Sequence, residues 1–133
     1  MQSPGDIHQL VDILHLKIQQ IQKLCPKAKI FVTAVLPSRL PKMNNNIMTF
    51  NSLVDEMLYS SFNQTVWHLG VGHFLDSKGL LAMKLTRKGD EIHLGELGIC
   101  KFVRCLKQWV YVRERQERVR QRKATRPVGV YPT

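Results

Sequence analysis

Apolar side chains recur along the first 24 residues with the three-and-four spacing that places them on one face of a helix. The repeat spans residues 4–24, and its members are Ile7, Leu10, Val11, Leu14, Ile18 and Ile21. This periodicity predicts an amphipathic helix. Ser3 is placed to cap the first turn, Pro4 suits the first helical position, and Cys25-Pro26 ends the pattern.

Short apolar runs and a second helical stripe follow. Residues 29–36 form a nearly continuous apolar and β-branched run, which predicts a strand buried on both faces. After a polar loop at 38–42, a stripe over about 46–61 predicts a second helix. Residues 66–71 predict a second strand, which residues 74–76 could extend.

A third helical stripe runs from Leu97 to Val110, and the arginine-rich segment that follows is expected to prolong this helix past Val112. The order helix, strand, helix, strand, loop and helix predicts an α/β fold. Two strands are too few, because buried parallel strands need neighbours and sheets average about five or six strands. We therefore expect further strands from a segment before Met1 or from a partner, such as a homo-oligomer that covers the exposed sheet edge.

Length and composition fit one domain with a basic extension. The 133 residues are 44% apolar, which suffices for a single core over residues 1–112, followed by a basic helical extension and tail over residues 113–133. No run of about 18 apolar residues occurs and the start lacks a secretory signal pattern, so we expect an intracellular location, cytoplasmic or nuclear. Three cysteines without CxxC spacing indicate neither a disulfide framework nor a zinc site, and no cofactor is indicated.

The formal net charge is +10, and half of it lies in the extension. Seven basic side chains against two glutamates make this segment a candidate nucleic-acid-binding region. The basic residues are Arg113, Arg115, Arg118, Arg120, Arg122, Lys123 and Arg126. Such a segment fits a solvated helix, a contact with nucleic-acid phosphates, or a contact with an anionic membrane surface.

An acid precedes a histidine by three residues in a turn bracketed by Gly89 and Gly98. A carboxylate at Asp90 can fix the tautomer of His93 and stabilise the imidazolium that forms when the ring acts as a general base. We therefore take Asp90 and His93 as candidate catalytic residues, although this spacing also fits a surface turn that caps the third helix. His68 and His73 show no metal-ligand spacing, so no metal site is predicted there.

The order of these blocks resembles the C-terminal half of the SGNH (GDSL-like) hydrolase superfamily over about residues 7–110. The similar blocks are the first helix, Cys25 to Ile30 leading into the strand that ends Val35-Leu36-Pro37, Asn45 to Asn51, and Asp90-Glu91-Ile92-His93-Leu94 with Gly98. The resemblance implies a partial three-layer α/β/α fold with a parallel sheet, flavodoxin-like in outline and without its N-terminal strands. It also implies that Asp90 and His93 match the acid and base of a catalytic triad.

The family's remaining blocks have no counterpart in the sequence. In that family the serine nucleophile lies in a GDS-type turn, and further oxyanion donors come from a glycine and an asparagine, all ahead of the helix that begins here near Pro4. Gly5-Asp6 is followed by Ile7 instead of serine. The resemblance thus implies an acyl- or acetyl-ester hydrolase that is incomplete and inactive alone, and that acts on a small acyl ester when an upstream segment completes it.

The alternative is a non-catalytic binding module whose arginine-rich tail contacts nucleic acid. Such tails also accompany SGNH-like esterase domains that resemble those encoded by some retroelements.

Overall fold

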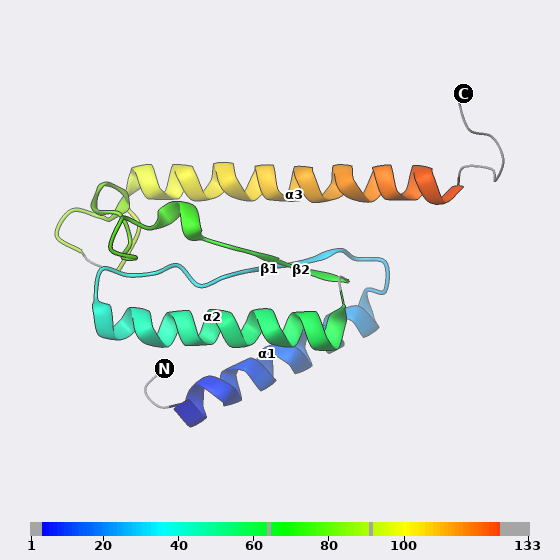
Figure 1. Ribbon diagram of the computed structural model, residues 1–133, viewed down its shortest axis with the longest axis horizontal. Helices are drawn as coiled ribbons and strands as arrows, with labels where there is room; N and C mark the ends of the chain where they lie inside the picture. Colours follow the sequence, from blue (N-terminus) through cyan, green and yellow to red (C-terminus); the bar gives the residue numbers. More distant parts are fainter. Residues whose placement is uncertain (1–3, 64, 91, 126–133) are drawn as a thin grey trace. The chain divides into compact units, whose positions relative to one another are not determined.

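The computed structural model describes residues 4–63, 65–90 and 92–125 (Figure 1). The chain divides into two compact units, residues 1–99 and 100–133. The helices and strands are α1 (Pro4–Leu24), β1 (Ile30–Thr33), α2 (Pro41–Phe62), β2 (Val66–Leu69) and α3 (Glu96–Thr125), with short 3₁₀ turns at Gly72–Phe74 and Met83–Leu85. The fold is therefore mixed α/β, as the sequence predicts.

The two strands form a parallel pair in which Ile30 lies opposite Val66 and Thr33 opposite Leu69. One face of the pair meets α1 and α2 (Figure 1). The buried side chains at the centre of this core are Val11, Ile18, Val54, Leu58, Phe62 and Val66. On the other face Phe31 stacks on Trp67 across the two strands, with ring centroids 4.8 Å apart. Such cross-strand aromatic contacts stabilise a short pair of strands.

The first strand is shorter and more exposed than its sequence predicts. β1 ends at Thr33, and all four of its residues are only partly buried, so the expected strand with two buried faces is wrong for the described residues. The reason is that β1 pairs with a single strand here. Beyond it, the side chain of Asn51 accepts a hydrogen bond from the Val35 N–H and donates one to the Val35 carbonyl, which replaces strand pairing at that residue.

Two other boundaries differ from expectation. α2 begins at Pro41, five residues before the predicted start, because proline suits the first helical turn and Asn44 is buried inside the helix instead of preceding it. Residues 72–74 form a 3₁₀ turn, so residues 74–76 do not extend β2.

α3 runs through the arginine-rich segment to Thr125, which confirms the predicted prolongation. Ser3 lies outside the described residues. Within the described ranges, no helix has the length and apolar character needed to cross a membrane.

Candidate active site

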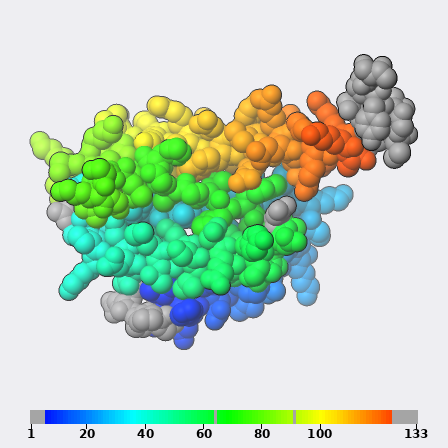
Figure 2. All heavy atoms as spheres, in the orientation of Figure 1, coloured from blue at the N-terminus to red at the C-terminus, as the bar shows by residue number. Residues whose placement is uncertain are grey.

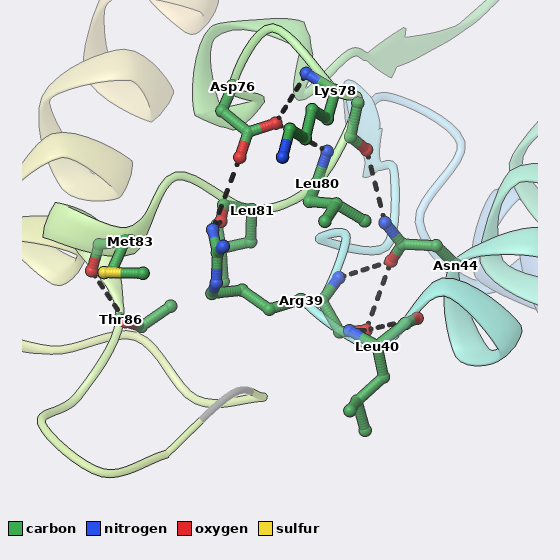
Figure 3. Close-up of polar contacts among 11 residues, drawn as sticks. Arg39, Leu40, Asn44, Asp76, Lys78, Leu80, Leu81, Met83 and Thr86 are labelled. Atoms are coloured by element: carbon green, nitrogen blue, oxygen red, sulfur yellow. Dashed lines mark hydrogen bonds and ion pairs between the residues drawn. The ribbon is translucent and has the colours of Figure 1, made fainter.

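A buried asparagine ties the loop after β1 to the loop after β2. Asn44 Oδ1 accepts a hydrogen bond from the Ser38 N–H at 2.6 Å, and Asn44 Nδ2 donates to the Gly79 carbonyl at 3.2 Å. The Ser38 hydroxyl accepts the Leu40 N–H at 3.0 Å and lies 3.2 Å from Asn44 Oδ1 (Figure 3). Ser38 and Asn44 are both buried, so these bonds satisfy polar groups that water does not reach.

An ion pair makes a second tie between the same two loops. Arg39 donates to the Leu81 carbonyl at 2.7 Å and to Asp76 Oδ2 at 3.3 Å (Figure 3). Asp76 Oδ1 accepts the Lys78 and Leu80 N–H groups. The Leu80 N–H first, then the Lys78 N–H and Arg39, lower the pKa of Asp76 against the opposing effect of desolvation. These contacts fix the start of the long connection that leads to Asp90.

The end of that connection folds back on itself just before α3. Thr86 and Leu94 form an antiparallel bridge, and the Gly95 N–H donates to the Leu85 carbonyl at 2.8 Å. A side chain at Gly98 would collide with the Leu85 carbonyl oxygen. Gly98 therefore lets the first turn of α3 lie directly against the backbone of residues 85–86. This explains in physical terms why a glycine follows the DxxH turn.

The turn itself brings Asp90 and His93 together as predicted. The Arg87 N–H donates to the His93 carbonyl at 2.9 Å, and Gly89 has φ +77°, which favours glycine. Asp90 Oδ1 accepts the N–H groups of Ile92 at 2.8 Å and His93 at 3.1 Å. The other oxygen, Oδ2, lies 2.7 Å from His93 Nδ1.

The backbone holds the carboxylate in its charged form. The Ile92 N–H, then the His93 ring and the His93 N–H, lower the pKa of Asp90 to about 2. The charged Asp90 can accept a hydrogen bond from the Nδ1–H of His93, and in that tautomer Nε2 is the ring nitrogen that can take up a proton. The His93 side chain is 71% exposed, whereas that of Asp90 is 26% exposed. A fixed acid thus orients an accessible imidazole.

No serine in the described part of the chain is placed as a partner for this imidazole. Ser38 is buried and its hydroxyl is used within the loop network. The other described serines, all exposed, are Ser52, Ser60, Ser61 and Ser77. None of the described serines forms a hydrogen bond with His93. Within the described residues, Asp90 and His93 thus form an acid–base pair without a serine hydroxyl beside it.

A second histidine–aspartate pair was not predicted from the sequence. His68 Nδ1 on β2 lies 3.1 Å from Asp55 Oδ1 on α2. The two residues are 13 apart and belong to different elements, so no local spacing signals their contact. Here the ring is hidden and the acid is not, with exposures of 13% and 75%. His68 Nε2 is buried and has no hydrogen-bond partner in the described structure.

The remaining candidate residues are the basic residues of the predicted extension. Six of the seven predicted basic residues lie on α3, and Arg126 lies outside the described residues. Among described side chains, no three of the His, Cys, Asp and Glu type come together in a way that could hold a metal ion.

No protein-family model matches the sequence, and no curated protein does. Among the solved structures that are similar in fold is a protein from Streptococcus pneumonia described as a "putative platelet activating factor". The TM-score is 0.66 at 22% sequence identity, and the match covers 79% of this chain and 52% of that chain. The chain thus spans about half the length of this structure. At this identity the likeness establishes the α/β fold alone.

Proposed function

We propose that residues 1–99 form the acid–base half of an ester hydrolase of the SGNH type, which cleaves short acyl or acetyl esters. The observation that carries this proposal is the 2.7 Å contact between His93 Nδ1 and an Asp90 carboxylate already fixed by two backbone N–H groups. A preorganised acid and an accessible imidazole are what a hydroxyl nucleophile needs for activation.

The chemistry follows from the geometry of this pair. A serine hydroxyl supplied by another segment would pass its proton to His93 Nε2 while its oxygen attacks the acyl carbon. Asp90 would stabilise the imidazolium, which then returns the proton to the leaving alcohol. Water, activated by the same ring, would release the acid and restore the serine. The 133 residues alone are expected to be nearly inert, because the serine and oxyanion blocks of the SGNH family have no counterpart in the sequence.

Surfaces left uncovered in the first unit support the need for a completing segment. α1 buries one face in the core, yet its neighbouring flank exposes Leu10, Ile13, Ile21 and Leu24. β1 pairs with a single strand among the described residues. A segment that adds a parallel strand beside β1 and a helix beside α1 would cover both surfaces. The half of the similar structure that this chain does not match is large enough for such a segment.

The test compares the 133-residue chain with a longer chain that also carries the segment encoded before Met1. Hydrolysis of p-nitrophenyl acetate is expected from the longer chain and close to the buffer rate from the 133 residues. A fluorophosphonate probe is expected to label a serine in the added segment. His93→Ala in the longer chain should slow hydrolysis by about 10³-fold or more.

His8→Ala is the matched control, because His8 is an exposed histidine of the same unit that lies on α1. It should leave the rate within about twofold. Hydrolysis by the His93→Ala variant as fast as by the parent would refute the acid–base role. A longer chain that cleaves no short acyl ester would instead favour the non-catalytic binding module.

A further inference from the structure

The two units carry very different charge. Residues 1–99 contain ten basic and eight acidic side chains, whereas residues 100–133 contain ten basic and two acidic ones. Formal charges of +2 and +8 follow. The charge of the chain is therefore concentrated in the second unit, whose described part belongs to α3.

The basic residues of α3 are not spread evenly around the helix. At 3.6 residues per turn, one stripe about 80° wide and about 27 Å long contains five cations and a tyrosine. Its members, all exposed, are Arg104, Lys107, Tyr111, Arg115, Arg118 and Arg122. A surface hollow lies on this stripe and is lined by Tyr111, three of these arginines and Val119. The arginine-rich part of α3 is coloured orange to red in Figure 2.

The two acids of the segment lie away from the centre of this stripe. Glu117 holds Arg120, on the opposite side of the helix, through two hydrogen bonds of 2.9 and 3.0 Å. Glu114 lies at the border of the stripe and reaches Arg118 at the longer distance of 3.8 Å. The stripe is thus the more strongly positive side of α3, and the side that contains Arg113 and Arg120 is closer to neutral.

We propose that this stripe binds single-stranded nucleic acid, with the cations on the phosphates and Tyr111 as a platform for an unstacked base. Rows of cations with an interleaved aromatic ring are the usual means of sequence-independent single-strand binding. A tyrosine exposed at the centre of the row favours a single strand over a duplex, whose bases are already stacked. The proposal does not depend on the ester-hydrolase assignment.

An anionic membrane is the less suitable partner for the same charge. A helix that lies in a membrane interface needs a broad apolar face opposite its cations. Between Arg113 and Ala124 the apolar side chains are Val119 and Ala124 alone. This part of α3, which contains three of the five cations of the stripe, has the charge to attract an anionic surface and lacks the apolar face that would enter it.

The experiment measures binding of the full 133-residue chain to a fluorescent 20-nucleotide oligouridine over a series of salt concentrations. Affinity falls as salt rises, so the slope of log K against log salt is negative. Replacing Arg115, Arg118 and Arg122 with Gln should make this slope shallower by about 2, since each lost phosphate contact contributes about 0.7. Affinity near 0.1 M salt should fall at least about tenfold.

The matched control replaces Arg113, Arg120 and Lys123 with Gln, which removes the same charge from the other side of α3. This variant should lose less than about threefold in affinity. Tyr111→Ala should weaken binding about fivefold or more without changing the salt slope, and Tyr111→Phe should restore it. Circular dichroism of each variant establishes that α3 is retained.

Three outcomes would overturn the proposal. Equal losses from the two triple variants would mean that net charge, and not the stripe, determines binding. Binding to phosphatidylserine vesicles without binding to the oligouridine would assign the stripe to a membrane surface. Tighter binding to duplex RNA than to the single strand, unaffected by Tyr111→Ala, would exclude the stacking platform.

Discussion

The two histidine–aspartate pairs of the first unit have similar contacts and opposite exposures. At the turn, Asp90 is the less exposed partner and its carboxylate is fixed by two backbone N–H groups, while the ring of His93 is open to solvent. Between β2 and α2, the ring of His68 is hidden and Asp55 is exposed.

The difference matters because a short contact between an acid and an imidazole is not sufficient for general-base chemistry. A general base must offer one ring nitrogen to a substrate or nucleophile while the other is held by the acid. His93 meets this condition, because its ring is accessible. His68 does not, because its Nε2 is buried. The Asp55–His68 contact links a strand to the helix that covers it, which is a structural role.

The largest expected effect comes from removing the charge of Asp90, and the same change at Asp55 is the comparison. In a chain completed by its nucleophile, Asp90→Asn should slow ester hydrolysis by about 100-fold or more, because an amide favours the wrong tautomer of His93 and cannot stabilise the imidazolium. Asp55→Asn should change the rate by less than about threefold. Steady-state kcat values of the two variants provide the comparison. Equal effects would mean that the exposure of the two rings does not separate their roles.

A smaller effect, on stability, is expected from a substitution at Gly98, where α3 lies against the backbone beside the Asp90–His93 turn. Gly98→Ala should lower the free energy of unfolding by about 1–3 kcal/mol, because the added methyl group meets the Leu85 carbonyl. Gly70→Ala is the control, since a Cβ there meets nothing within 4 Å. Chemical denaturation of both variants measures the difference. Equal stability of the two variants would show that the close approach at Gly98 is not needed for the fold.

Contacts within a few residues were predictable from the sequence, and contacts between elements were not. The Asp90–His93 contact spans three residues, so the sequence could suggest it, although the candidate role of the pair came from the order of the preceding helix and strand blocks. The reason for Gly98 is the backbone of Leu85, 13 residues earlier, which no local pattern reveals. Asp55 and His68 were missed for the same reason, because a helix and a strand must first be placed together.

The helix boundaries show a related limit. Asn44 has the polar character of a loop residue, and the sequence predicts a helix that starts after it. In the structure it is buried within α2, because Ser38 and Gly79 satisfy its side chain. The amphipathic pattern of α1, by contrast, gave both of its ends correctly, since its burial follows the helical period directly.

The smallest expected effect is on how stability changes with pH, because the Asp90 carboxylate is held in its charged form. The folded-state pKa of Asp90 is about 2, below its ordinary value of 3.8, so its contribution to stability is present above about pH 4 and is lost as the pH falls toward 2. Asp90→Asn should therefore lower the melting temperature at pH 5 and have little effect at pH 2.

Asp76, whose pKa is also lowered, contributes with the same sign, so the single variant retains part of the acid dependence. Thermal unfolding between pH 2 and 5 should show a shallower profile for Asp90→Asn and the shallowest for Asp90→Asn combined with Asp76→Asn. An Asp90→Asn profile parallel to that of the parent would mean that the backbone N–H groups do not hold the carboxylate charged, and the preorganised acid at the turn would lose its physical basis.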